Sequence, residues 1–232
     1  MLKISLIFLL SISFLFAEEK AGKLKGSYGL GLMTLPKKEL SKKQKILPIP
    51  MFEMNYMLFY ISLMKGIGVN IPIYKNIFGS VGVYYNFNNE SLSGGKQQIN
   101  GGFNYNTALI ILLPYNFMLS SHYKQRFDYE DGSEINFSFG YHIKFAEKFK
   151  TFLSLSTNYT DKKHNNFYYG EDIKTFKNIA IGSGMIYEID KEHSINFMLF
   201  YSKYIKQIAN SEIVKEGVPY KVIGGIIYGW KF

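Results

Sequence analysis

Hydrophobic and polar residues alternate one by one along much of this chain. In residues 133–143, positions 135, 137, 139, 141 and 143 are aromatic or aliphatic, and the positions between them are polar or small. Successive residues of a strand point to opposite faces, so such a strand has one apolar and one polar face. The same alternation recurs in residues 77–87, 101–112, 115–124 and 149–159. The pattern predicts an all-β protein.

Eleven segments carry strand signals: residues 26–34, 51–63, 67–74, 77–87, 101–112, 115–124, 133–143, 149–159, 177–187, 193–204 and 220–232. Some are joined by short polar turns such as Lys75-Asn76. Others are separated by long connections, namely Leu35 to Pro50, Asn88 to Asn100, Thr160 to Phe176 and Ile205 to Pro219. Short turns at one end and long loops at the other are typical of a transmembrane antiparallel β-barrel.

The number of strands is open at this point. Eleven is odd, whereas single-chain bacterial barrels have an even number of strands. Either residues 51–74 form one long strand that is kinked near Gly66 and Gly68, which gives 10 strands, or one strand has been missed, which gives 12. Both solutions place the N-terminus and Phe232 in the periplasm.

A soluble β-sandwich is the alternative fold, because its apolar faces would form a core. Two features favour the membrane barrel. The polar faces hold Gly, Ser and Asn rather than the Lys and Glu that solubilise an exposed sheet. The apolar faces end in Tyr and Phe, like the aromatic girdles of membrane barrels.

Residues 1–17 have the pattern of a secretory signal peptide. Lys3 precedes the apolar run Ile4 to Phe16, and Ala17 stands before a charged segment. A run of 13 residues is too short to cross a bilayer, which needs roughly 20. We therefore expect cleavage after Ala17. Residues 18–232 are then expected to form a single β-barrel domain in the outer membrane of a Gram-negative bacterium.

Composition narrows the chemistry. The chain has no Cys, which excludes disulfides, thiolate metal sites and thiol catalysis. The net charge of +9 includes a basic run, Lys37, Lys38, Lys42, Lys43 and Lys45. Such a run is either a solvated loop or a contact for lipopolysaccharide phosphates. Nucleic acid is not expected as a partner, because the run lacks interleaved aromatic residues.

No constellation of residues predicts catalysis. The histidines His122, His142, His164 and His193 show no metal-ligand spacing, so no metal or cofactor is expected. Ser120, Ser121 and His122 are adjacent, but on a strand only Ser120 shares a face with His122. We therefore assign no catalytic, cofactor-binding or metal residues and predict that the protein is not an enzyme.

The last strand combines alternation with a terminal aromatic residue. Val222, Ile226, Tyr228, Trp230 and Phe232 share one face of residues 220–232. This resembles the closing strand of bacterial outer-membrane barrels, which their assembly machinery recognises.

Three further stretches carry a family resemblance. The first runs from Ile46-Leu47-Pro48-Ile49-Pro50 to Lys65-Gly66-Ile67-Gly68-Val69, the second from Asn158-Tyr159 to Phe167-Tyr168-Tyr169-Gly170, and the third from Tyr201-Ser202-Lys203-Tyr204 to Ala209-Asn210-Ser211-Glu212-Ile213-Val214. They are similar to motifs of the MltA-interacting protein (MipA/OmpV) family of outer-membrane proteins. Glu171 and Glu212 depart from the family's usual Val and Pro.

The resemblance implies an outer-membrane barrel and, as in the family's namesake, a scaffold that links a periplasmic lytic murein transglycosylase to a peptidoglycan synthase. It names no catalytic residues. We expect outer-membrane lipid and lipopolysaccharide to surround the barrel. The alternatives are a small porin or channel, suggested by lumen faces rich in Gly, Ser and Asn, and a surface adhesin that acts through the long loops.

Overall fold

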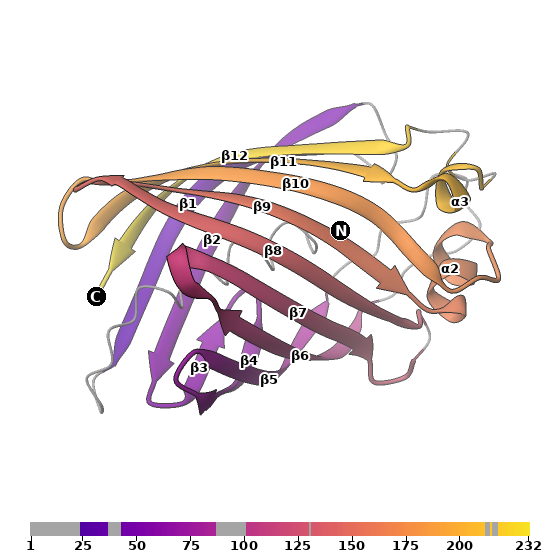
Figure 1. Ribbon diagram of the computed structural model, residues 1–232, viewed down its shortest axis with the longest axis horizontal. Coiled ribbons are helices and arrows are strands. Elements are labelled where there is room, and N and C mark those ends of the chain that lie inside the picture. Colours follow the sequence, from indigo (N-terminus) through magenta and orange to yellow (C-terminus); the bar gives the residue numbers. More distant parts are fainter. Residues whose placement is uncertain (1–23, 37–42, 87–100, 130, 212–213, 215–217) are drawn as a thin grey trace.

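The computed structural model describes residues 24–36, 43–86, 101–129, 131–211, 214 and 218–232. Within these ranges twelve antiparallel strands form a closed barrel, in which each strand pairs with its neighbours in sequence and β1 pairs with β12 (Figure 1). The predicted barrel is confirmed with twelve strands, and the count of ten is wrong. The signal peptide at residues 1–17 lies outside the described residues and stays a prediction.

The strands are β1 Lys25–Pro36, β2 Gln44–Tyr56, β3 Phe59–Ser62, β4 Gly66–Tyr74, β5 Ile77–Asn86, β6 Gly102–Leu112, β7 Phe117–Arg126, β8 Ser133–Ala146, β9 Phe149–Thr160, β10 Thr175–Glu188, β11 His193–Tyr204 and β12 Tyr220–Lys231. A short 3-10 helix, η1 (Pro114–Asn116), joins β6 to β7. The helices α2 (Lys162–Tyr169) and α3 (Lys206–Ala209) lie together at the end of the barrel away from Phe232 (Figure 1). We call this the loop end and the opposite one the turn end.

The region before β4 corrects the sequence prediction. Residues 35–50 were expected to be a loop. Leu35 and Pro36 lie instead in β1 and residues 44–50 in β2, where Pro48 and Pro50 pair across from Leu32 and Leu30 of β1. The expected strand 51–63 is in fact the end of β2, a tight turn that begins at Met57 with φ 52°, and β3. The twelfth strand was therefore missed because residues 51–63 were predicted as one strand, although a turn divides them.

The predicted strand faces are confirmed. Along the middle of β8, Asn136 and Ser138 are buried inside the barrel, whereas Phe137 and Phe139 are exposed on its outer surface. The outer surface of the other strands is likewise covered by exposed apolar side chains, among them Leu30, Ile67, Val81, Leu155 and Ile181. Such a continuous apolar band is the surface that a barrel presents to lipid.

Both helices lie in segments that were expected to be loops. Asp161 caps α2 by accepting a hydrogen bond from the His164 backbone N–H, and α2 ends at Gly170 in the left-handed conformation. No helix in the described part of the chain is long and apolar enough to cross a membrane.

The barrel closes where its two terminal strands meet. The backbones of Gly26 and Phe232 exchange hydrogen bonds of 3.0 and 2.9 Å. On the outer face, the Tyr28 ring lies 5.3 Å from that of Trp230 and 6.2 Å from that of Phe232. The alternating aromatic residues of the last strand thus take part in ring closure.

Replacing both Trp230 and Phe232 by Ser is expected to lower the amount of assembled barrel severalfold, because the closing pair loses its aromatic contacts. Heat-modifiable migration of the outer-membrane fraction on a denaturing gel measures the assembled protein. The control is Tyr201 and Tyr220 replaced together by Ser, which removes a stacked outer pair away from closure. An equal loss in both variants would contradict a special role of the aromatic residues at the closing pair.

Candidate functional site

The lumen, rather than the outer wall, holds the unusual side chains. A cluster of buried apolar residues fills one level of it: Met33, Leu35, Ile49, Ile110, Met118, Phe152, Met198, Phe200, Ile223 and Ile227. Met33 of β1 and Met118 of β7, six places apart around the ring, are each 1% exposed. Buried apolar side chains from opposite walls of the described barrel thus belong to one cluster at this level of the lumen. The lumen is therefore more apolar than its Gly, Ser and Asn content suggested.

A row of hydrogen-bonded polar side chains crosses the inner wall nearer the loop end. Asn136 of β8 donates to Asn158 of β9 (2.7 Å), Asn158 donates to Asn178 of β10 (2.9 Å), and Asn178 donates to Ser202 of β11 (2.6 Å). The strand register places the three asparagines directly opposite one another. Each side-chain amide therefore provides a hydrogen-bond partner for its neighbour, and buried polar groups need such partners.

Next to this row lies a buried charge cluster. The Glu134 carboxylate of β8 is 3.1 Å from the Lys124 Nζ of β7 and 3.0 Å from the Lys177 Nζ of β10. The His164 Nε2 of α2 lies 3.7 Å from the same carboxylate. One carboxylate thus holds the buried ammonium group of Lys177 and the partly buried one of Lys124. Each ion needs its partner because burial removes hydration.

The helix α2 covers this cluster. The ring of His164 is within hydrogen-bond distance of the Asp131 carbonyl oxygen (3.1 Å), and the Tyr168 hydroxyl donates to the Asp131 carboxylate (2.8 Å). Burial and the neighbouring Lys177 charge lower the pKa of His164 to about 3. His164 is therefore neutral near pH 7 and adds no third positive charge beside Glu134.

Asp161 fixes α2 to the barrel rim. Its carboxylate accepts hydrogen bonds from the His164 N–H, the Ser133 N–H and hydroxyl, and the Tyr129 hydroxyl. Burial alone would raise the pKa of Asp161, but these four donors hold it below its ordinary value.

Asp161→Ala is expected to destabilise α2 by about 1 kcal/mol, as the loss of an N-cap usually does, while the strands remain folded. Hydrogen exchange of the amides of residues 162–169 measures the change. Asp172→Ala is the control, because Asp172 forms only an exposed pair with Lys162. Unchanged exchange of α2 in Asp161→Ala would contradict the capping role.

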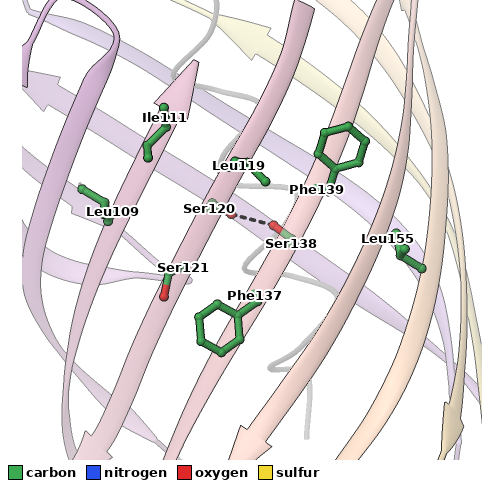
Figure 2. A pocket seen from close by; sticks show the side chains of 9 residues that line it. All are labelled: Leu109, Ile111, Leu119, Ser120, Ser121, Phe137, Ser138, Phe139 and Leu155. Atoms are coloured by element: carbon green, nitrogen blue, oxygen red, sulfur yellow. Dashed lines mark hydrogen bonds between the residues drawn. The ribbon is translucent and has the colours of Figure 1, made fainter. Parts of the chain in front are cut away.

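The serine and histidine candidates do not meet. Ser120 faces the lumen and shares a hydrogen bond of 2.6 Å with Ser138. Ser121 faces outward, at the floor of an apolar depression of about 380 Å³ that Figure 2 shows, lined chiefly by Leu109, Leu119, Phe137 and Phe139. The Nε2 of His122 is buried in the lumen and has no hydrogen-bond partner in the part of the chain described. The geometry therefore assembles no Ser-His dyad here.

The other histidines are dispersed as well. His142 faces the lumen 6.3 Å from the Phe152 ring, and His193 pairs with Asp190 at the turn end. Across the described ranges, no group of three or more His, Asp or Glu side chains is arranged to hold a metal ion.

Sequence reasoning missed the Glu134 cluster and the asparagine row. The signal was present, because Lys124, Glu134, Asn136 and Asn158 occupy the polar faces of their strands. The partners, however, are set by the pairing register between successive strands, which cannot be derived from any one strand alone.

The comparisons with known proteins agree with this fold. The family model of the MltA-interacting protein MipA matches residues 28–232. The chain belongs to this family. The suspected resemblance is thereby confirmed, and a search of curated proteins finds no match.

Among solved structures, the MipA-family chain is similar to an outer membrane channel from Pseudomonas putida F1, with 9% identity, TM-score 0.47, and 94% of this chain and 98% of that chain covered. It is also similar to the CymD monoaromatic hydrocarbon channel, with 8% identity, TM-score 0.46, and 93% and 90% covered. A third is OmpT of Vibrio cholerae, with 9% identity, TM-score 0.41, and 93% and 99% covered.

The family and the fold together give the location. A MipA-family chain that forms a closed barrel with an apolar outer band is an outer-membrane β-barrel protein. By the general organisation of such barrels, short turns face the periplasm and long loops face outward.

Proposed function

We propose that this barrel is an outer-membrane scaffold that holds a periplasmic lytic murein transglycosylase and links it to a peptidoglycan synthase. The cluster of buried apolar side chains in the lumen is the observation that carries this proposal. A porin needs a continuous aqueous path, whereas Met33, Met118 and Phe152 are almost fully buried across the lumen. A barrel with such an apolar lumen suits a membrane anchor better than a pore for water-soluble solutes.

The turn end offers a surface for such a partner. Tyr115 is 85% exposed at the tip of the β6–β7 connection, and its φ of 60° is costly for a bulky residue. Met57, in the β2–β3 turn, and Phe145, in β8 beside the β8–β9 turn, are also exposed. Exposed apolar side chains gathered at one end mark an interaction surface. The partner named by the family, the transglycosylase MltA, is the class of protein that we expect to bind here.

The protein is not an enzyme on this proposal, since the buried Ser120 pairs with Ser138 and Ser121 faces outward.

Lys43 and Lys45 lie at the loop end, where lipopolysaccharide phosphates are expected in the outer leaflet. The other lysines of the basic run, Lys37, Lys38 and Lys42, lie outside the described residues.

The test combines capture and conductance on one preparation. Crosslinking in whole cells followed by purification of the barrel is expected to capture a murein hydrolase or synthase, and the purified barrel is expected to show no steady current in a planar bilayer. The double change Tyr115→Ser and Phe145→Ser should reduce capture severalfold. Phe127→Ser, which removes an exposed aromatic residue at the loop end, should leave capture unchanged. Steady conductance without a captured murein enzyme would favour the channel.

A further inference from the structure

In the described part of the chain, the wall of the barrel is incomplete beside the first half of β2. The strand β3 has 4 residues, and the β3–β4 hairpin turns back at residues 63–65. The Leu63 N–H donates to the Phe52 carbonyl at 3.0 Å. Beyond Phe52 toward the loop end, no strand of the described chain pairs with β2 on this side, although β1 continues to pair with it on the other. Residues 46–51 therefore form an edge in an otherwise closed barrel.

The sequence of β2 suits an edge at this place. Backbone groups of alternate residues point to the same side of a strand, so Pro48 and Pro50 point the same way as the Phe52 carbonyl, toward the missing neighbour. Neither proline has an N–H. Two of the donors that would stand unpaired along this edge are thereby removed, which is how natural proteins protect edge strands.

The edge lies within the apolar band of the outer surface. Pro48 and Pro50 pair with Leu32 and Leu30 of β1, which are exposed on the outer face. Ile46 on the same face of β2 is 67% exposed. An unpaired backbone N–H is costly in hydrocarbon. At this depth, proline avoids that cost because it has no N–H. The interruption of the wall therefore faces lipid rather than water.

On the inner side, the same residues lead into the apolar cluster of the lumen. Ile49 is a buried member of this cluster, and Leu47, Met51 and Met64 pack against it. With Met33, Met118 and Met198, the cluster involves five of the 9 methionines of the chain. Methionine side chains are flexible and polarisable, and they adapt to apolar ligands of varied shape. Glu53 and Lys65, next in sequence to Phe52 and Met64, form an ion pair of 3.2 Å.

We propose that small apolar molecules dissolved in the outer membrane enter the lumen laterally past the β2 edge, Ile46–Met51, and bind within the methionine-rich cluster. The expected class of ligand follows from the side chains and backbone groups that line the path past β2. Both faces of β2 are apolar here, and the edge offers few hydrogen-bond donors. A polar solute would lose its hydration without compensation. This binding site is independent of the scaffold function, which uses the turn end.

Photolabelling in lipid vesicles tests the route. The probe is 3-trifluoromethyl-3-phenyldiazirine, an apolar carbene precursor that partitions into the bilayer, and benzene is the competitor. We expect labelling at the lumen-facing Leu47, Ile49 and Met64 as well as at the lipid-facing Leu30. Excess benzene should reduce the lumen labelling at least fivefold and saturably, while the labelling of Leu30 changes little. Absent lumen labelling, or lumen labelling that benzene does not displace, would overturn the proposal.

Two matched variants place the site. Ile49→Trp fills the lumen beside the edge, whereas Ile46→Trp adds the same ring on the outer face of the same strand. The first should reduce the displaceable labelling of Met64 at least threefold, and the second should not. Equal labelling in the two variants would contradict the route. Heat-modifiable migration verifies that each variant has assembled. If Ile49→Trp does not assemble, the benzene competition in the unaltered protein tests the proposed binding site by itself.

Discussion

Glu134→Gln is expected to destabilise the barrel by about 3–5 kcal/mol, the usual cost of removing one partner from a buried ion pair. The change leaves the ammonium groups of Lys124 and Lys177, at 3.1 and 3.0 Å from the carboxylate, without a counter-charge inside the barrel. Urea unfolding of the refolded protein in detergent micelles, followed by circular dichroism, measures the free energy of unfolding.

The control for Glu134 is another glutamate that pairs with two lysines. Glu188 lies 2.8 Å from Lys150 and 3.3 Å from Lys231 at the turn end, where the Lys231 side chain is 49% exposed. Because water screens this cluster, Glu188→Gln should cost at most about 1 kcal/mol. Adding Lys177→Met to Glu134→Gln should recover part of the loss, since one unpaired charge is removed. Equal effects of the two glutamate changes would show that the Glu134 cluster is hydrated.

Phe139→Lys is expected to cost about 2–4 kcal/mol, the effect of a lysine on the lipid face near the bilayer midplane. Phe139 lies at the middle of β8 on the outer surface. Unfolding in lipid vesicles rather than micelles is the appropriate measurement, because the cost depends on depth in the bilayer.

The matched control is the same substitution at the end of the same strand. Phe145 is exposed beside the β8–β9 turn, so Phe145→Lys should cost only about 0–1 kcal/mol. Equal losses would contradict the position of the membrane band. The alternation along β8 alone suggests that Ser138→Lys is mild. Ser138 is however buried and hydrogen-bonded to Ser120, so we expect this lysine to be costly as well.

Strands with one apolar and one polar face could be predicted from the sequence, and residues 133–143 lie within the observed β8. Strand β2 could not be predicted in this way. Proline is excluded from a strand only where a neighbouring strand needs its N–H, and the sequence alone does not show whether that neighbour is present. The helix α2 could not either, since Lys-Lys-His-Asn-Asn-Phe-Tyr-Tyr has no helical hydrophobic repeat. It is held by Asp131 and Asp161, through contacts that lie outside the helix itself.

The filling of the lumen was hidden for a related reason. On β11, Met198 and Phe200 point inward while Phe197 and Leu199 point outward. With apolar residues on both faces, the period of two disappears and the sequence does not distinguish lipid from lumen. Glu134 and Lys177 likewise meet only through the register of β8, β9 and β10. Local sequence patterns thus predicted the strands of the barrel wall. Which side chains meet in the lumen depends on the pairing of all the strands.

The pairing of β1 with β12 also sets the order of folding events. Every other strand pair joins neighbours in the sequence and can begin as a hairpin, whereas Ser27 and Lys231 come from opposite ends of the chain. The entropy cost of closing a loop grows with its length, and contacts between distant residues form slowly. Ring closure is therefore the late, slow step. Until then both terminal strands expose unpaired backbone, which makes the unclosed chain prone to aggregation.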